Sequence, residues 1–250
     1  MNILVTFAVQ AEFGPWQRRR TFRRVRGEWP VFESEFGNAR IHAILTGMGQ
    51  SHALEAVRQV LPAKPDICIS TGLAGALRTG YRPGEIVAAR LVSEVGEPVA
   101  VASHRELLST AVDCGARQVE RFATSHTLVA RADQKRHLGN EAEAVEMESY
   151  TILAEAARYG VPSVAVRAIS DTVEFDMPYD FDRARDARGH VRIGGIITQV
   201  LRQPSGLPSL LTLARDCRVA SRQLANFLDA FTGALADRLV PIESNMVAAL

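Results

Sequence analysis

Acidic side chains near the middle of the chain indicate acid–base chemistry. Glu146 and Glu148 are two residues apart in Ala-Val-Glu-Met-Glu, and Ser170 and Asp171 form an adjacent pair after an apolar run. If the first segment is extended, its two glutamates point to the same side, because strand side chains alternate. On a helix the same spacing would place them on nearly opposite faces. The stretch 142–173 therefore predicts two carboxylates and a Ser-Asp pair close together in the fold.

Glu12 is a further carboxylate in a comparable position. It lies just past a buried apolar strand that we predict at 2–7, and Asp171 follows a predicted strand at 163–169 in the same way. In open α/β sheets, ligands bind beyond the carboxyl ends of the strands. One such residue would usually cap a helix. With Glu146 and Glu148 the number of such carboxylates is four. Four of them predict a crevice that holds general acid/base and hydroxyl-binding groups.

Other kinds of active site find little support in the motifs. Glycine-rich turns at 46–49 and 71–75 follow strands and let the backbone approach a ligand closely. Neither matches a dinucleotide or nucleoside triphosphate motif. The chain has no G-x-S-x-G elbow, and its six histidines have no metal-type spacing. We therefore expect neither a cofactor nor a metal ion.

The size and composition of the chain are typical of one globular domain. It has 250 residues, 47% of them hydrophobic, and a formal net charge of +1. Apolar strands alternate with helical segments, which predicts an α/β class with a largely parallel central sheet. We expect the domain to span 1–236 and residues 237–250 to form a C-terminal tail. The low net charge argues against a nucleic-acid partner.

The expected elements follow from hydrophobic periodicity and from turn residues. Besides 2–7 and 163–169, strands are predicted at 33–36, 40–45, 66–70, 85–92 and 127–130, and a strand ends at 146–148. Helices are predicted at 51–61, 104–113, 134–139, 149–159, 191–201 and 207–235. The polar segment 175–189 is a candidate flexible loop that could close over a site after Asp171.

The cysteines, the N-terminus and an arginine cluster bear on location. Three widely spaced cysteines argue against a disulfide framework, and no run has the features of a signal peptide or the length of a membrane span. A reducing cytoplasm is the default expectation. Six arginines lie between positions 18 and 26. A solvated charged face is the simplest interpretation of that cluster, and contact with an anionic partner such as a membrane surface is the alternative.

Five segments of the chain resemble one enzyme family. Residues 8–12, 46–53, 70–77, 144–149 and 166–172 are similar to the purine nucleoside phosphorylase and nucleosidase superfamily. Within it they look most like the methylthioadenosine/S-adenosylhomocysteine nucleosidase type, and Val-Glu-Met-Glu together with Arg-Ala-Ile-Ser-Asp is the specific part. The resemblance covers roughly residues 2–200. It implies a single-domain three-layer fold with a central mixed, largely parallel sheet flanked by helices. It also implies a homodimer, and a small purine nucleoside as substrate with water or phosphate as co-substrate.

The resemblance also implies roles for individual residues. Asp171 resembles the acid that protonates the purine N7, Ser170 its hydrogen-bonding neighbour, and Glu12 the carboxylate that activates the attacking water. Glu148 resembles the glutamate that binds the ribose hydroxyls, and Met147 the methionine beneath the sugar. The remaining expected substrate contacts are Leu128 and Val129 on the base-contacting strand, the turn residues Thr71, Gly72 and Leu73, and Glu146 near the site.

Several alternatives stay open at this point. Glu12 would repel phosphate, which favours hydrolysis over phosphorolysis. Leu73 departs from the small hydroxyl residue that nucleosidases have there. The Met-Glu-Ser-Tyr sequence, Pro178 and a long C-terminal helix after Arg-Gln-Pro also resemble hopanoid-associated phosphorylases, which are thought to act on an adenosylated lipid. Futalosine hydrolase is a third candidate. A non-catalytic nucleoside-binding module is the fourth, although it would need no acid and water activator together.

Overall fold

A computed structural model describes residues 1–25, 27–180, 199–200 and 203–238. Within these residues, eleven strands form one sheet in the order β2-β3-β4-β1-β5-β11-β6-β10-β9-β7-β8. The five central strands are parallel to one another. They are β4 (Ala39–Leu45), β1 (Asn2–Phe7), β5 (Ile67–Ser70), β11 (Ser163–Asp171) and β6 (Leu73–Ala76).

The outer strands add antiparallel pairs to this centre. On one side, β2 (Arg23–Val25) and β3 (Val31–Phe36) form a meander with β4. On the other side lie β10 (Ala144–Glu146), β9 (Arg117–Thr124), β7 (Ile86–Glu94) and β8 (Ala100–Ala102). Residues 165–168 of β11 also pair with β7, so β11, β6, β10, β9 and β7 close on themselves. The sheet is therefore mixed, with a parallel centre.

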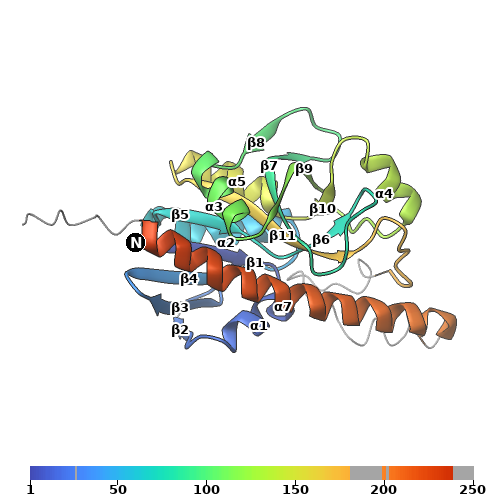
Figure 1. Ribbon diagram of the computed structural model, residues 1–250, viewed down its shortest axis with the longest axis horizontal. Helices are drawn as coiled ribbons and strands as arrows, with labels where there is room; N and C mark the ends of the chain where they lie inside the picture. The colour runs from blue at the N-terminus through green and yellow to red at the C-terminus, as the bar shows by residue number, and fades with distance from the viewer. Residues whose placement is uncertain (26, 181–198, 201–202, 239–250) are drawn as a thin grey trace, which may run out of the picture.

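Helices cover both faces of the sheet (Figure 1). One layer contains α1 (Gln10–Gln17), α3 (Arg105–Asp113) and the long helix α7 (Leu207–Arg238), which packs on β11 and α1. The other contains α2 (Gln50–Val60) and α5 (Ser149–Arg158). The short helix α4 (Ala132–Leu138) precedes β10, and single 3₁₀ turns occur at Leu61–Ala63 and Pro204–Gly206.

The pattern of β1 shows why the fold has three layers. Ile3, Val5 and Phe7 are buried in the cluster that includes α1, α3 and α7. Leu4 lies in the opposite cluster, with α2 and α5. A parallel strand whose two faces are both apolar has to be covered on both sides. The expected three-layer α/β fold with a central mixed sheet is confirmed.

Three local predictions were wrong. Residues 127–130 form a loop, and the strand in this region is β9, whose sequence Arg-Gln-Val-Glu-Arg-Phe-Ala-Thr is too polar to indicate an interior strand. Leu73–Ala76 is a strand and not part of a turn, because small residues fit where β11 and β10 flank it closely. Helix α1 was missed because Gly14 and Pro15 lie inside it and both disfavour a helix.

The C-terminal part of the chain agrees with the prediction where the structure describes it. The helix predicted at 207–235 is α7, which continues through Asp237 and Arg238 into the expected tail. The rest of the tail, most of the helix predicted at 191–201, and residues 181–189 of the candidate loop lie outside the described residues. In the described part of the chain, no helix combines the length and the apolar character needed to cross a bilayer.

Candidate active site

A cavity of about 760 Å³ lies at the carboxyl ends of β1, β10 and β11. Its wall includes all the site residues predicted from the sequence except Thr71 and Gly72. These wall residues are Glu12, Leu73, Leu128, Val129, Glu146, Met147, Glu148, Ser170 and Asp171. Carboxylates that are far apart in the sequence therefore face one space.

Glu12 is held in the first turn of α1 by backbone amides. The N–H groups of Ala8 and Val9 donate to its Oε2 over 2.9 and 3.3 Å, and the N–H of Leu73 donates to its Oε1 over 3.0 Å. Burial raises the pKa of Glu12 and outweighs these hydrogen bonds, which act in the opposite direction. The side chain is both a helix cap and a fixed carboxylate at the cavity wall.

Gly72 makes room for this carboxylate. Its φ of +147° is a conformation that favours glycine, and a Cβ there would lie 2.9 Å from Glu12 Oε1. Gly72 therefore acts behind Glu12 and not at the cavity wall. Thr71 is also buried behind the wall. The turn 71–73 contributes to the site by placing Glu12 and by presenting Leu73 to the cavity.

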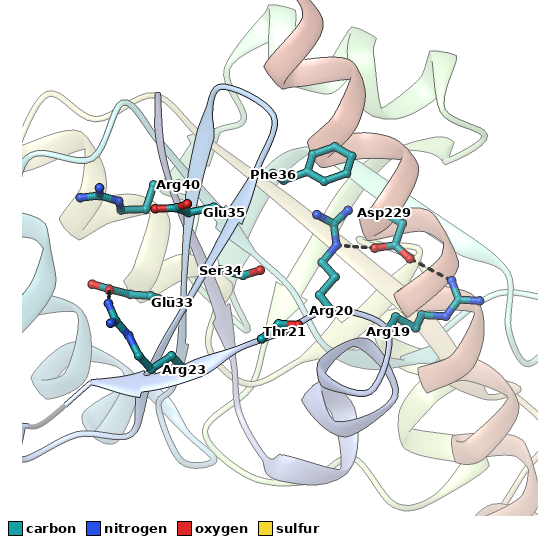
Figure 2. A pocket seen from close by; sticks show the side chains of 10 residues that line it. All are labelled: Arg19, Arg20, Thr21, Arg23, Glu33, Ser34, Glu35, Phe36, Arg40 and Asp229. Atoms are coloured by element: carbon teal, nitrogen blue, oxygen red, sulfur yellow. Dashed lines mark hydrogen bonds and ion pairs between the residues drawn. The ribbon is translucent and has the colours of Figure 1, made fainter.

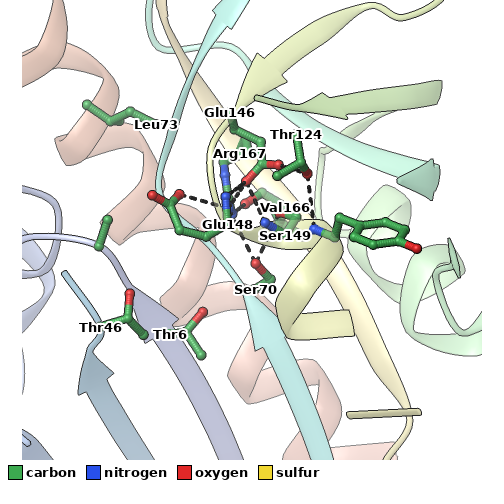
Figure 3. A network of polar contacts seen from close by, with 12 residues as sticks. Thr6, Thr46, Ser70, Leu73, Thr124, Glu146, Glu148, Ser149, Val166 and Arg167 are labelled. Atoms are coloured by element: carbon green, nitrogen blue, oxygen red, sulfur yellow. Dashed lines mark hydrogen bonds and ion pairs between the residues drawn. The ribbon is translucent and has the colours of Figure 1, made fainter. Parts of the chain in front are cut away.

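Glu146 and Glu148 are arranged around a buried arginine that sequence reasoning could not place (Figure 3). Arg167 Nη2 lies 2.6 Å from Glu146 Oε2 and 3.9 Å from Glu148 Oε2. Glu146 Oε2 also accepts the backbone N–H groups of Glu148 and Ser149, over 3.0 and 2.7 Å. Glu146 thus orients the start of α5, and Glu148 projects from that turn.

Glu148 is the more available of the two carboxylates. The N–H of Gly49 donates to its Oε1 over 2.8 Å, and among the described residues its Oε2 has only the longer contact with Arg167. Burial and the neighbouring Glu146 raise the pKa of Glu148 to about 8, against the opposing effects of Arg167 and Gly49. A charged residue inside the apolar strand 163–169 was the signal that could have identified Arg167, because burying an unpaired charge is costly.

Ser170 and Asp171 lie at a shift in the register between β11 and β6, which falls between Ile169 and Asp171. Such bulges commonly re-aim a side chain next to an active site. Ser170 Oγ lies 2.6 Å from Asp171 Oδ1, and the ammonium of Lys135 contacts Asp171 Oδ2. Lys135, on α4, is fully buried. It is the second charged residue that the sequence analysis did not assign to the site.

Loops and helices complete the cavity with apolar surface. Leu128 and Val129 lie in the loop 125–131, so they contribute without the strand that we predicted for them. The outer wall comes from α1 and α7 and from the segment after β11. Its apolar residues include Pro15, Met177, Leu213, Ala214 and Cys217. Three arginines also lie there, Arg18 on the loop after α1 and Arg218 and Arg222 on α7.

Three arginines of the cluster at 18–26, namely Arg19, Arg20 and Arg23, border a different groove, of about 870 Å³, near the end of α7 (Figure 2). Arg18 lines the candidate active site instead, and Arg26 lies outside the described residues. Both Arg19 and Arg20 pair with Asp229, at 3.0 and 2.6 Å. Arg23 pairs with Glu33 at 3.4 Å. The groove has acidic and basic groups that satisfy one another, so these charges agree with a solvated face. The cavity lined by the buried carboxylates Glu12, Glu148 and Asp171 is the smaller of the two.

Acidic groups at the carboxyl ends of parallel strands, around a largely apolar cavity, define the fold and site as those of an enzyme acting on a small molecule. The chain belongs to the phosphorylase superfamily, whose family model matches residues 3–202. The resemblance inferred from the five sequence segments is thereby confirmed.

Known proteins similar to this chain agree with that assignment. The 5′-methylthioadenosine/S-adenosylhomocysteine nucleosidase of Glaesserella parasuis serovar 5 is 27% identical over 176 residues, which cover 61% of this chain and 76% of the relative. Its counterpart from Exiguobacterium sp. is 26% identical over 178 residues, covering 60% and 76%.

Solved structures share the fold at low sequence identity. A Helicobacter pylori nucleosidase mutant with 5′-methylthioadenosine in its active site has a TM-score of 0.72 and 15% identity, covering 92% of this chain and 97% of the other. A futalosine hydrolase mutant from the same species has the same TM-score and identity, covering 93% and 98%.

Proposed function

We propose that this enzyme hydrolyses the N-ribosyl bond of an adenosine-type nucleoside. The observation that carries the proposal is the meeting of three buried carboxylates, Glu12, Glu148 and Asp171, at one cavity wall. Cleavage of this bond builds positive charge on the sugar and negative charge on the base. These charges are stabilised by a proton donor at the base and by a carboxylate near the sugar, and an oriented water completes the reaction.

Each carboxylate has a role in the proposed reaction. Asp171 delivers a proton to N7 of the base as the N-ribosyl bond breaks, and Ser170 fixes its orientation. Glu148 accepts hydrogen bonds from the 2′ and 3′ hydroxyls, with Met147 beneath the sugar. Glu12 takes a proton from the water that attacks C1′. The fixed position of Glu12 supports this role, because three backbone N–H groups hold it at the wall.

Hydrolysis fits the electrostatics of this wall better than phosphorolysis does. A phosphate beside the sugar would meet the carboxylates of Glu12 and Glu148. The buried cation on that side, Arg167, already contacts Glu146 over 2.6 Å. The relatives named above as nucleosidases support the same choice. The 5′ substituent is the part of the substrate that we leave open among methylthioadenosine, adenosylhomocysteine and futalosine types.

A second candidate is phosphorolysis of a nucleoside with a bulky apolar 5′ substituent. The specific observation in its favour is the apolar outer wall from α1 and α7, where Pro15, Leu213 and Ala214 face the cavity. Leu73 adds to that surface. Arg18, Arg218 and Arg222 would be the cations available to phosphate. An adenosylated lipid analogue is the probe that represents this candidate.

Base release from a panel of nucleosides tests both candidates. The panel contains methylthioadenosine, adenosylhomocysteine, futalosine and an adenosylated lipid analogue, each incubated with and without phosphate. We expect free base and ribose-type sugar without phosphate. In Asp171→Asn and Glu12→Gln we expect turnover to fall by roughly 10²–10⁴-fold each. Wild-type turnover in either variant would contradict the assigned roles, and strictly phosphate-dependent turnover would favour the second candidate.

A further inference from the structure

The ammonium of Lys135 is placed where an acid catalyst needs a proton store. The side chain is fully buried, and Nζ donates to Asp171 Oδ2, to the carbonyl of Thr172 over 3.1 Å and to the carbonyl of Phe175 over 2.8 Å. All three ammonium hydrogens therefore have an acceptor. An isolated buried ammonium would be very costly, so the carboxylate of Asp171 is the group that makes this burial tolerable.

Both carboxylate oxygens of Asp171 accept hydrogen bonds. Ser170 Oγ lies 2.6 Å from one carboxylate oxygen, and Lys135 donates to the other. A hydroxyl and an ammonium that both contact a carboxylate stabilise the charged species. In the resting pair the proton then resides on nitrogen. A carboxylate without a proton cannot protonate a leaving base, so the proton has to reach Asp171 from elsewhere.

We propose that Lys135 supplies, through Asp171, the proton that the leaving base receives. Lys135 is a positioning residue and a proton store, since it touches Asp171 and not the substrate. The inference rests on the proposed nucleosidase function.

The proton balance closes with the groups already assigned. The Nζ–H bond of Lys135 breaks as an O–H bond forms on Asp171, and that O–H bond breaks as N7–H forms. The electron pair of the N-ribosyl bond leaves with the base. Water adds its oxygen to C1′ and gives one proton to Glu12. Glu12 then releases that proton to solvent. Lys135 takes up one proton from solvent before the next turnover, so no net proton is gained or lost.

In the part of the chain that the structure describes, few other titratable groups face the Lys135–Asp171 pair. Cys217 on α7 lies opposite Asp171, but burial together with the charges on Asp171 and Glu12 raises the pKa of its thiol to about 12. Glu12 faces the pair across the cavity, and Asp176 accepts the Ala132 N–H at the start of α4. The charged residues on the outer side of α4 are exposed, namely Arg131, Asp133, Arg136 and His137. The alkaline behaviour of kcat should therefore report mainly the pair itself.

The pH dependence of kcat distinguishes a proton store from a structural ion pair. An ordinary lysine ammonium keeps its proton to about pH 10, whereas a lone carboxyl loses it several units lower. In Lys135→Met the acid is the Asp171 carboxyl alone. We expect kcat at pH 8 to fall by at least about 10²-fold, and its alkaline limb to move to lower pH by roughly two units or more. An unchanged limb would overturn the proposal. Arg136→Met, an exposed cation on the same helix, is the matched control.

A double variant keeps the test valid if Lys135→Met alone is unstable. Lys135→Met with Asp171→Asn removes both charges and so leaves no unpaired ion. If the two residues act as one unit, its kcat should equal that of Asp171→Asn within about threefold. If the fold-loss in kcat of the double variant were the product of the losses in the two single variants, the proposal would be overturned. If wild type releases no base from any nucleoside, the proposed function fails, whereas an active wild type with multiplied losses refutes only the role of Lys135.

Discussion

At the scale of single residues, the site is a set of carboxylates whose environments differ. Glu12 is held by three backbone N–H groups. Glu148 has one backbone N–H and Arg167 at 3.9 Å, and Asp171 has a hydroxyl and an ammonium. Groups of the same type can take different roles when their surroundings stabilise different protonation states. Glu146 has the most saturated contacts of the four, so its contribution is to orient Glu148 and Arg167.

The pKa of Glu148 gives a prediction about pH. Burial and Glu146 raise this pKa to about 8, so in the free enzyme the carboxyl is mostly neutral below pH 8. The ionised form accepts hydrogen bonds from both ribose hydroxyls. We therefore expect kcat/KM to rise about tenfold per pH unit up to about pH 8 and then to level off. Glu148→Gln should lower kcat/KM and remove that limb. A limb that persists in the variant would contradict the assignment.

The carboxylates could be predicted from the sequence because each follows a strand within a specific motif. Arg167 entered the sequence analysis only as part of the Arg-Ala-Ile-Ser-Asp motif, without a role, and Lys135 was overlooked within a short polar helix. Their partners are distant in the sequence: Glu146 is 21 residues from Arg167, and Asp171 is 36 residues from Lys135. A buried ion pair of this kind is fixed by tertiary structure: the charge inside the apolar strand 163–169 could have marked Arg167 as buried, but the local pattern does not reveal its partner.

At the scale of elements, the strand ends and their turns position the reactive groups. The turn before β6 places Glu12, the bulge in β11 places Asp171, and the start of α5 places Glu148. Strands with clear apolar runs, such as β1, β5 and β11, were predicted nearly correctly. The small-residue strand β6, the polar strand β9 and the Gly-Pro-containing helix α1 were not, because their formation depends on neighbours and not on propensity.

Gly72→Ala tests whether the turn before β6 positions Glu12. A Cβ at this site would press on Glu12 Oε1 at 2.9 Å, so the carboxylate must move. We expect kcat/KM to fall by roughly 10²-fold, since small displacements of a reacting group have effects of that size. Gly80→Ala is the matched control: its φ is +85°, but a Cβ there meets nothing within 4 Å. Equal losses of activity in both variants would show that backbone strain alone is responsible.

Replacing Arg167 tests whether its buried ion pair connects β11 to the carboxylates at the end of β10 and just before α5. Arg167→Met leaves Glu146 buried without its cation and should lower the free energy of unfolding by about 3–5 kcal/mol. Chemical denaturation measures this. Arg167→Met with Glu146→Gln should recover part of the loss. Arg90→Met, which breaks an exposed pair with Glu120, should leave the free energy of unfolding nearly unchanged. A loss at Arg167 no larger than at Arg90 would contradict a buried ion-pair role.

At the scale of the whole molecule, two layers of helices serve different purposes around one sheet. The α2–α5 layer is mainly core, whereas α1 and α7 also form the outer wall of the cavity. The α/β class followed from the alternation of apolar strands and helices, and the three layers followed from the resemblance to the enzyme family. The closure of β7 onto β11 was not predicted, because pairing between strands about 80 residues apart leaves no local mark in the sequence.

The central claim is that water, and not phosphate, attacks the sugar. The direct measurement is turnover of the best nucleoside substrate in ¹⁸O-labelled water that also contains phosphate, with the sugar product analysed by mass spectrometry at early times. We predict a free sugar that already carries ¹⁸O, formed at a rate that phosphate does not change, and loss of this product in Glu12→Gln. An unlabelled sugar 1-phosphate, formed only when phosphate is present, would contradict it.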